Sequence, residues 1–430
     1  MIALISDVKN HVGKEITLRG WMFNKRGSGK IWFLELRDGS GFIQGIVTKD
    51  AGEAVMQTAE KLTMESSVIV KGTVTRHPKR VDEYELQVKN IEIAQLCTEE
   101  YPISKKEHGP DFLLDNRHLW LRSKRQWAIQ RVRDVVIQAV YDFFHENNFI
   151  KIDTPILTPN ACEGATTLFG IEYFDEGTVY LSQSGQLYLE AAIMSVGRGF
   201  DFGPTFRAEK SKTKRHLTEF WMMDAEAAFA EHEDNMRTQE NMICFIVKRA
   251  LERCEKELAI LERNLEPLKK IKAPFTRLTY SEAIPKLQSM GSDIKFGEDL
   301  GNDDEGLLTK NSDVPVFVHK WPKTIKPFYM KTDPENPELV LNDDLIGTEG
   351  AGELIGGSQR EDNYEKLKVA IEHEGLKGPE YQWYLDLRKY GSVPHSGFGL
   401  GLERTVGWIC GAEHVRETIP FPRMINRMKP

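Results

Sequence analysis

Residues 206–226 constrain the fold of this chain more than any other stretch. Their sequence, FRAEKSKTKRHLTEFWMMDAE, places a run of cationic residues between two strand-like ends. Two β-prone segments joined by a short polar loop are typical of an antiparallel hairpin. A loop of Lys and Arg is usually solvated surface or a contact for nucleic acid, but here carboxylates and aromatic residues flank it. The stretch therefore predicts a sheet-containing domain with a charged hairpin whose ends carry chemistry.

The hairpin has the side chains that a nucleoside triphosphate requires. Planar cations bind phosphates, an aromatic face binds the base, and oxygen ligands bind the accompanying magnesium. Arg207 could hold a phosphate whose negative charge grows in a transition state, and Phe220 could stack on adenine. A basic surface hairpin with a core phenylalanine would have the same pattern, so this stretch alone leaves both interpretations open.

Composition excludes several classes of protein. The 430 residues are 40% hydrophobic, enough for two or three domains. The chain lacks an apolar run long enough to span a membrane and a signal-peptide pattern, so the cytosol is the expected compartment. Its five cysteines occur singly, which argues against a disulfide framework or a zinc site. A net charge of −8 disfavours non-specific binding of polyanions, so any contact with nucleic acid should be local.

The N-terminal part reads as a small barrel. Residues 15–95 give three strand-like segments, a helix-like segment and two more strands, with the turn signal RDGSG between the second and third. This is the element order of a five-stranded OB barrel, a fold that often binds single-stranded nucleic acid. A barrel without that function would look the same. We expect this all-β domain over 1–97 and a hinge over the turn-rich residues 98–122.

The remainder, 123–430, is predicted to be one α+β domain with a mainly antiparallel sheet flanked by helices. Apolar residues from Ile129 to Phe143 recur at three- to four-residue steps and predict a helix over 123–147, and 231–262 is a second helix candidate. The acidic, turn-rich stretch 297–306 is expected to be solvated surface.

Two further stretches carry signals. FIKIDTPILTP is an apolar strand with Pro155, and GFGLGLERTVGWICG is a Gly-rich strand that enters a helix with Arg404 at the junction. The GxGxG spacing without a βαβ unit is a weak dinucleotide signal. Small residues there more plausibly let a ligand lie against the strand.

Taken together, these stretches resemble the three signature motifs of the class II aminoacyl-tRNA synthetases. The motif 1 proline, the motif 2 pattern FRxE–loop–(H/R)xxxF and the motif 3 strand ending in arginine occur in the family's order and separation. The N-terminal barrel is similar to the anticodon-binding domain of the aspartyl, asparaginyl and lysyl subgroup, and LLDNRHLWLR resembles its hinge. The resemblance thus covers the whole chain.

The stretch QSGQLYLE, residues 183–190, indicates which amino acid the resemblance implies as the substrate. In the aspartyl enzymes a similar sequence, QSPQxxK, provides a lysine that pairs with the substrate carboxylate, and Leu189 stands at that position here. Leucine cannot neutralise a carboxylate in a desolvated pocket. The C-terminal third resembles the asparaginyl-tRNA synthetases. Arg360 matches the arginine of that family that donates to the side-chain carbonyl oxygen of asparagine. Asp224 departs from them, because it stands where they usually have glutamate and the aspartyl enzymes have aspartate.

The resemblance implies a set of site residues. ATP would be bound by Arg207, Glu209, Arg215, His216, Phe220, Glu353 and Arg404, with Arg207 and Arg404 catalytic. Asparagine would be bound by Glu163, Ser184, Gln186, Leu189, Asp224 and Arg360, with Glu163 and Gln186 on its α-amino group. Mg²⁺ would be held by Asp344 and Glu353, with Asp343 a weaker candidate. The anticodon would be contacted by Arg26, Phe33 and Gln44, while Trp32 is expected to be structural. For His395, a turn role and a direct role stay equally open.

The implied reaction is activation of L-asparagine by ATP and its transfer to tRNA(Asn), in a homodimer with motif 1 at the interface. One rival is an aspartyl-tRNA synthetase, possibly non-discriminating, which Leu189 opposes and Asp224 favours. A tRNA-independent asparagine synthetase is opposed by the N-terminal barrel. A non-catalytic RNA-binding descendant is opposed by the intact motif residues Arg207, Glu209, Phe220 and Arg404.

Overall fold

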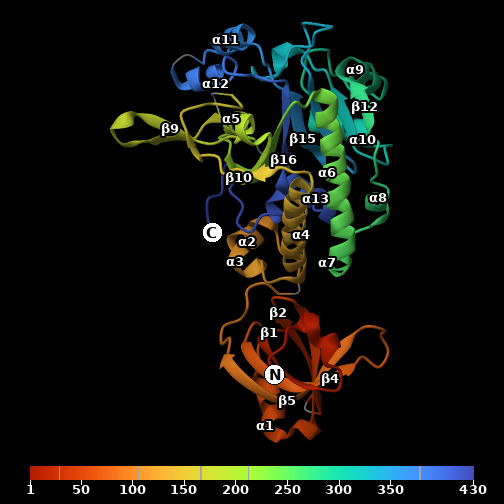
Figure 1. The fold of residues 1–430 in the computed structure, drawn as a ribbon. Coiled ribbons are helices and arrows are strands. Elements are labelled where there is room, and N and C mark those ends of the chain that lie inside the picture. Colours follow the sequence, from red (N-terminus) through yellow and green to blue (C-terminus); the bar gives the residue numbers. More distant parts are fainter. Residues whose placement is uncertain (29, 105, 165–166, 212, 377–378) are drawn as a thin grey trace. The chain divides into compact units, whose positions relative to one another are not determined.

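The computed structural model describes residues 1–28, 30–104, 106–164, 167–211, 213–376 and 379–430. The chain divides into two compact units, Met1–Gly109 and Pro110–Pro430 (Figure 1). In the described part of the chain, every helix is too short or too polar to cross a membrane. The predicted hinge, 98–122, spans the division between the units and includes two short helices, α2 (Pro110–Asp115) and α3 (Arg117–Trp120).

The first unit is a closed five-stranded barrel, which confirms the predicted OB fold. Its strands are β1 (Glu15–Ser28), β2 (Ile31–Asp38), β3 (Gly41–Thr48), β4 (Ser67–Arg76) and β5 (Tyr84–Gln95), with α1 (Glu53–Lys61) between β3 and β4. They close in the order β1-β2-β3-β5-β4, and only the β3–β5 pairing is parallel among the pairs of this barrel in the described residues. The RDGSG turn forms because the Asp38 carboxylate accepts from the N–H groups of Ser40 and Gly41.

The second unit is built on an eight-stranded sheet in the order β12-β13-β14-β15-β16-β11-β10-β6. These strands are β6 (Ile150–Lys151), β10 (Arg198–Phe206), β11 (Glu219–Ala228), β12 (Thr276–Thr279), β13 (Val316–His319), β14 (Asn342–Gly347), β15 (Gly352–Gln359) and β16 (His395–Gly401). Parallel pairing is confined to the two ends, β10–β6 and β12–β13, in the part of the sheet that is described. The prediction of a mainly antiparallel sheet is confirmed.

Four helices that pack against this sheet are α4 (Lys124–Glu146), α5 (Gln186–Val196), α6 (His232–Arg253) and α13 (Leu402–Cys410) (Figure 1). The other helices of this unit after α4 are α7 (Glu255–Ile260), α8 (Glu266–Lys269), α9 (Tyr280–Ser289), α10 (Asn302–Thr309), α11 (Tyr364–His373) and α12 (Gln382–Asp386). The helix predicted over 123–147 is present: Ser123 caps it by accepting from the Gln126 N–H, and Ile129 and Val136 are fully buried.

The helix predicted over 231–262 is wrong in one respect. It is two helices, because α6 ends at Arg253 and buried Cys254 adopts a non-helical conformation before α7 begins. Leu258 of α7 packs into the main core. A pattern of apolar residues continues across such a break, so periodicity did not reveal it.

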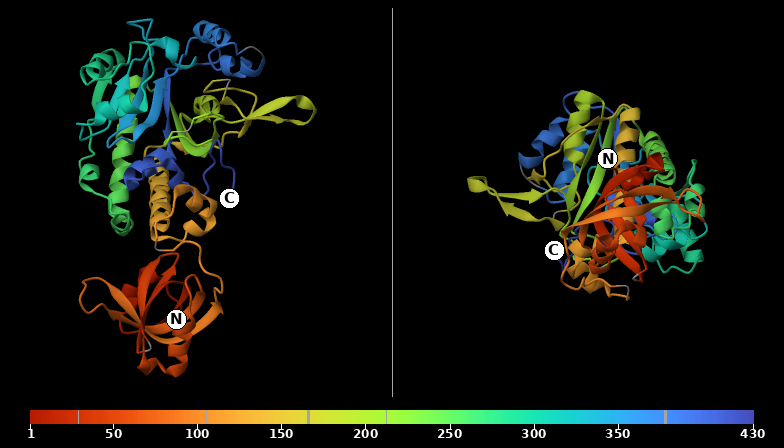
Figure 2. Two further views of the ribbon diagram at one scale, coloured as in Figure 1. Left: turned by 180° about the vertical axis from the view of Figure 1, so that it is seen from behind. Right: turned by 90° about the horizontal axis from the view of Figure 1, so that it is seen from below.

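A three-stranded sheet forms a separate element. It comprises β7 (Leu157–Thr158), β8 (Gly170–Glu172) and β9 (Thr178–Leu181) in the order β7-β9-β8. Figure 2 shows the hairpin of β8 and β9 extending away from the eight-stranded sheet. All three residues of β8 are exposed.

Candidate active site

A cavity of about 500 Å³ lies over the central strands of the large sheet. Its lining includes every residue of this unit that was predicted for ATP, metal or amino acid, except Leu189: Glu163, Ser184, Gln186, Arg207, Glu209, Arg215, His216, Phe220, Asp224, Asp344, Glu353, Arg360 and Arg404. The residues come from segments as far apart as 163 and 404. The fold therefore brings motifs 2 and 3 to one cavity, whereas the motif 1 proline, Pro155, is not part of its lining.

The predicted hairpin is formed by β10 and β11, whose register pairs Phe206 with Glu219. Arg207 follows β10 directly, and its guanidinium lies 5.5 Å from the ring centre of Phe220. Burial lowers the pKa of Arg207, but the carboxylates of Glu163 and Glu209 outweigh it and raise the pKa above its ordinary value. The buried Nε of Arg207 has no hydrogen-bond partner in the described structure. A buried donor without a partner is costly, so this one suits a ligand that brings an acceptor.

Arg215, at the far end of the hairpin loop, is held by a segment that the sequence did not connect to it. It donates to the Asn302 side-chain oxygen at 2.9 Å and to the Gly350 carbonyl at 2.6 Å, and it pairs with Glu305. Burial, followed by the charge of Glu353, raises the pKa of Glu305 to about 7. The expectation that 297–306 is solvated surface is thus incomplete: residues such as Glu298 and Asp303 are exposed, but other residues of this acidic segment, including Glu305, line the cavity.

His216 is a hydrogen-bonded member of the hairpin loop. Its Nδ1 lies 3.2 Å from the Ser211 hydroxyl and contacts Thr213, and its Nε2 lies 3.8 Å from a Glu209 oxygen. Burial, followed by the charge of Arg404, lowers the pKa of His216. The ring is therefore neutral at pH 7, and it can serve as a hydrogen-bonding rather than a charged group.

Arg404 lies in the first turn of α13, after the Gly-rich strand β16. Its guanidinium donates to the Glu353 carbonyl at 2.9 Å and to the Arg215 carbonyl at 3.5 Å. The Gly-rich strand has a second use that was not predicted. A Cβ at Gly399 would lie 2.7 Å from Asp224 Oδ1, so the absence of a side chain lets a carboxylate of β11 lie against the strand.

Asp224 occupies the floor of the cavity at its amino-acid end. Its Oδ2 accepts from the Gly185 N–H at 2.8 Å and from the Ser184 hydroxyl at 2.9 Å, whereas Oδ1 takes part in neither bond. The side chain is almost completely buried, and this burial raises its pKa to about 6. Asp224 thus fixes the QSGQ turn and keeps one oxygen for a ligand.

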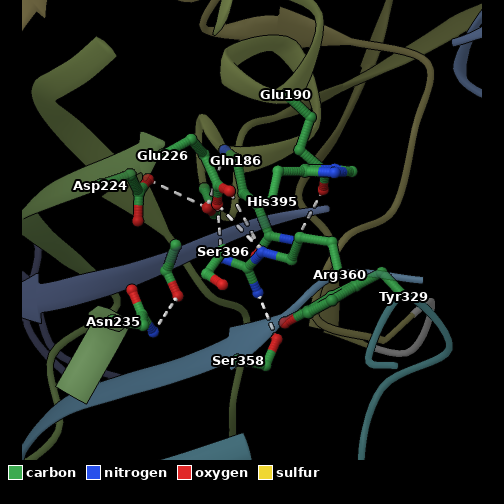
Figure 3. Close-up of polar contacts among 12 residues, drawn as sticks. Gln186, Glu190, Asp224, Glu226, Asn235, Tyr329, Ser358, Arg360, His395 and Ser396 are labelled. Atoms are coloured by element: carbon green, nitrogen blue, oxygen red, sulfur yellow. Dashed lines mark hydrogen bonds and ion pairs between the residues drawn. The ribbon is translucent and has the colours of Figure 1, made fainter. Parts of the chain in front are cut away.

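Arg360 is paired with Glu226, a residue that sequence reasoning missed (Figure 3). Its Nε donates to Glu226 Oε1 at 3.1 Å, and a terminal nitrogen donates to the Ser358 hydroxyl at 2.6 Å. Burial raises the pKa of Glu226 to about 7, although Arg360 opposes the shift. Since Glu226 follows Asp224 by two residues on β11, the strand period could have placed it on the same face.

Leu189 and His395 lie outside the cavity lining. Leu189 is completely buried on α5, so its prediction as an amino-acid-binding residue is not supported by its position. His395 is also buried: its Nε2 lies 2.9 Å from Glu190 Oε2, and its Nδ1 lies 2.8 Å from the Val393 carbonyl. Of the two roles left open for His395, the structural role fits these contacts.

The residues predicted for magnesium suit that ion. Asp344 on β14 and Glu353 on β15 converge over Gly356, where an added Cβ would lie 3.0 Å from a Glu353 oxygen and 4.0 Å from Asp344 Oδ1. Mg²⁺ is commonly held by one or two carboxylates together with substrate phosphates. In the described residues there is no larger cluster that could hold a metal by itself. Asp343 points to the other face, toward His232 at 3.1 Å.

Lys326 was also missed. Its ammonium donates to Asp344 Oδ2 at 2.7 Å and lies 3.8 Å from the ring centre of Trp321. Burial raises the pKa of Asp344 to about 7, with Lys326 opposing and Glu353 reinforcing the shift. Lys326 is one of several lysines in 319–331, and nothing in that sequence marks it for such a contact.

The barrel brings together the residues predicted to contact an anticodon. The Arg26 guanidinium donates to the Gln44 side-chain oxygen at 2.9 Å and lies 5.2 Å from the Phe33 ring centre. Gln44 in turn donates to Glu85 at 2.6 Å. Trp32 packs against the barrel core, in line with a structural role.

Comparison with known proteins gives full-length matches. Residues 109–425 match the family described as "tRNA synthetases class II (D, K and N)", and residues 16–94 match the OB-fold nucleic acid binding domain. The chain is 54% identical to an asparagine–tRNA ligase from Desulforamulus reducens and 52% identical to one from Pelotomaculum thermopropionicum, each over 99% of both chains. A crystal structure of asparaginyl-tRNA synthetase from Pyrococcus horikoshii, complexed with asparaginyl-adenylate, has a TM-score of 0.95 and 44% identity over 100% of both chains.

Proposed function

The chain belongs to the asparagine–tRNA ligases, within the class II tRNA synthetases for aspartate, lysine and asparagine, and from this membership we propose how its cavity performs the reaction. It activates asparagine with ATP and ligates it to tRNA. The observation that carries the residue assignments is the cavity itself, which joins the arginines of motifs 2 and 3 to a buried acid and a buried arginine at one end. The aspartyl and tRNA-independent alternatives are not favoured.

In the first step the carboxylate of asparagine attacks the α-phosphorus of ATP in line. A new P–O bond forms, the bond to the β-phosphate oxygen breaks, and asparaginyl-adenylate and pyrophosphate result. Phosphoryl transfer depends mainly on positioning and on stabilising developing charge. We assign this stabilisation to Arg207, whose free Nε offers a donor, with Arg404 on the other side and Phe220 against adenine.

We assign asparagine to the end of the cavity between Asp224 and Arg360. Arg360 would donate to the side-chain carbonyl oxygen, and the unengaged Oδ1 of Asp224 would accept from the amide nitrogen. A substrate carboxylate would meet the negative charge of Asp224, which disfavours aspartate. Glu163 and Gln186 would hold the α-ammonium group, and the Tyr329 hydroxyl, which donates to Glu163 at 2.8 Å, would keep that carboxylate in place.

Asp344 and Glu353 would hold Mg²⁺, which when bound neutralises phosphate charge. The same two acids also have cationic neighbours on this chain: Lys326 donates to Asp344, and Arg404 lies 3.5 Å from a Glu353 oxygen. Arg215, Glu209 and His216 would position the distal phosphates and the adenine from the hairpin loop.

In the second step the terminal ribose hydroxyl of tRNA(Asn), expected to be the 3′ one, attacks the mixed anhydride and AMP leaves. The chain supplies no covalent nucleophile, so its task is to orient the reactants. Arg26, Phe33 and Gln44 on the barrel would read the anticodon, with Phe33 stacking on an unpaired base and Gln44 contacting its edge.

We further propose a homodimer. Apolar side chains of the motif 1 region are unusually exposed: Ile150 by 49%, Ile156 by 45% and Leu157 by 44%. Contiguous exposed apolar residues mark interaction surfaces. The domain limits 1–97, 98–122 and 123–430 stay predictions, as does a cytosolic location.

The test is ATP–pyrophosphate exchange with asparagine and with aspartate, measured side by side. We expect exchange with asparagine alone, and none in Arg207→Ala, which should keep the wild-type melting temperature. Exchange that depends on aspartate and ignores asparagine would contradict the substrate assignment. Unchanged exchange in Arg207→Ala would contradict the role of that arginine.

A further inference from the structure

A completely buried carboxylate lies one helical turn beyond Gln186 on α5 (Figure 3). It belongs to Glu190, which does not itself line the cavity. Four buried side chains surround its two oxygens: Gln186 Nε2 at 3.1 Å, the Tyr384 hydroxyl at 2.8 Å, His395 Nε2 at 2.9 Å and an Arg388 terminal nitrogen at 2.6 Å. This network stands directly behind the amino-acid end of the cavity.

We propose that Glu190 is a positioning residue that determines the preference for asparagine over aspartate, acting through Gln186 and Arg360. The proposal rests on the proposed function, because it concerns the same amino-acid site. Two effects support it: the orientation of an amide that lines the cavity, and the balance of charge around the cavity's buried arginine.

The first effect concerns Gln186. A carboxylate only accepts hydrogen bonds, so the Gln186 amide must turn its NH₂ group toward Glu190. Its carbonyl oxygen is then free to face the cavity that Gln186 lines. An α-ammonium group needs such an acceptor. A neutral amide at position 190 could pair with Gln186 in either orientation, and the acceptor would no longer be fixed.

The second effect concerns charge. Two buried guanidiniums, Arg360 and Arg388, are matched by two buried carboxylates, Glu226 and Glu190. Burial alone would raise the pKa of Glu190, but the charge of Arg388 and the hydrogen bond from His395 outweigh burial and lower it, so Glu190 is ionised at pH 7. Its charge also acts on Arg360, whose pKa it helps to raise. The negative charge of Glu190 therefore weakens the attraction of Arg360 for a substrate carboxylate, whereas an amide substrate needs no such attraction.

On α5, the residue that determines selectivity is thus Glu190 and not Leu189. In the aspartyl enzymes' sequence QSPQxxK a lysine stands at the position of Leu189, but Leu189 does not line the cavity here. The neighbouring residue, Glu190, is on the same helical face as Gln186 because the two are four residues apart. The discriminating charge of this helix is therefore the acid at 190, and it is of the opposite sign to that lysine.

The experiment compares Glu190→Gln, Glu190→Asp and the control Glu257→Gln. Glu257 is a matched buried carboxylate on α7, paired with Arg131 at 2.7 Å and remote from the cavity lining. Pyrophosphate exchange gives kcat and KM for asparagine, aspartate and ATP, and thermal unfolding reports on folding. Because Glu190→Gln removes a charge-assisted hydrogen bond and a buried charge, we expect the KM for asparagine to rise about tenfold and the asparagine-to-aspartate ratio of kcat/KM to fall at least about tenfold.

The other variants separate charge from position. Glu190→Asp keeps the charge but not the reach, so the KM for asparagine should rise while the selectivity ratio stays within about threefold of wild type. Glu257→Gln should change neither. The KM for ATP should stay within about twofold of wild type in all three.

A purely structural role for Glu190 predicts equal losses for asparagine, aspartate and ATP, and that result would overturn the proposal. If Glu190→Gln does not fold, Glu190→Asp and Tyr384→Phe decide, because each should raise the KM for asparagine more than the KM for ATP. Wild-type exchange that depends on aspartate would instead defeat the proposed function, and it is seen before any variant is measured.

Discussion

Replacing Asp224 with asparagine should make the protein more stable and its substrate selection worse. Asp224→Asn preserves the size of the side chain, and the new amide oxygen can accept the two bonds from Ser184 and Gly185 that Oδ2 accepts now. The amide nitrogen then takes the place of Oδ1 beside Gly399. The substitution therefore removes a buried charge and turns an acceptor that faces the cavity into a donor.

The magnitude follows from the pKa of this acid. Burial raises it from 3.8 to about 6, and one pKa unit corresponds to about 1.4 kcal/mol, so the ionised side chain costs about 3 kcal/mol at pH 8. Removing the charge would therefore stabilise the protein, but the bonds from Ser184 and Gly185 are weaker when their acceptor is neutral. This weakening reduces the gain in stability by about 1 kcal/mol. The variant should thus be more stable than wild type by about 2 kcal/mol at pH 8.

The sign of the pH dependence is fixed by the direction of the shift. Because the native pKa is raised, native Asp224 keeps a proton that the unfolded chain releases between pH 3.8 and about 6. The free energy of unfolding of wild type therefore falls, relative to Asp224→Asn, as pH rises through that window. The advantage of the variant should be about 1 kcal/mol smaller at pH 5 than at pH 8.

Denaturant unfolding at both pH values measures the stability difference, and pyrophosphate exchange measures selection. In the pyrophosphate-exchange assay, the loss of an acceptor for the substrate amide should raise the KM for asparagine by about tenfold to a hundredfold. A stability difference that does not change with pH would refute the reasoning about the buried charge. Wild-type selectivity in the variant would refute the placement of Oδ1 against the substrate.

Three further predictions test other parts of the site. Gly399→Ala should reduce exchange more than about tenfold and lower the melting temperature, because its Cβ would lie 2.7 Å from Asp224 Oδ1, whereas Gly109→Ala controls for the loss of a glycine at an open position without a positive φ. Asp344→Asn should raise the Mg²⁺ concentration needed for half-maximal exchange, and Asp343→Asn, on the opposite face of the strand, should not; equal shifts would contradict the metal assignment. Gln44→Ala should raise the KM for tRNA by about tenfold and leave pyrophosphate exchange unchanged, and a loss of exchange would argue against a role confined to the anticodon.

Much of the fold was predictable because its signals are local. Strand alternation and the RDGSG turn gave the barrel, and the polar loop between two β-prone segments gave the β10–β11 hairpin. The site residues were found through motifs, each of which is also a short stretch. What these signals have in common is that the residues that form them are close in the sequence.

The missed residues depend on contacts between distant segments. Arg215 meets Glu305 ninety residues later, and Lys326 meets Asp344 from a loop without any motif. The acidic segment 297–306 is largely exposed, and its part in the cavity depends on Arg215, which lies far from it in the sequence. Glu226 was missed for a different reason: its pairing with Arg360 arises because a buried guanidinium needs a carboxylate partner, and the burial of Arg360 is not visible in the sequence.

The strand β11 would keep the proposed adenine and amino-acid ends of the site at a constant separation. Phe220, Met222 and Asp224 line the cavity, while the alternating residues Met223 and Ala225 are buried in the core on the other face. At about 3.3 Å per residue, Phe220 and Asp224 stand about 13 Å apart along a paired, central strand. An aminoacyl-adenylate must reach from a stacked base to a side-chain pocket, and this strand sets that span with its backbone. A one-residue slip would turn Met223 toward the cavity and Asp224 toward the core, so the burial of Met223 and Ala225 fixes the register on which substrate selection depends.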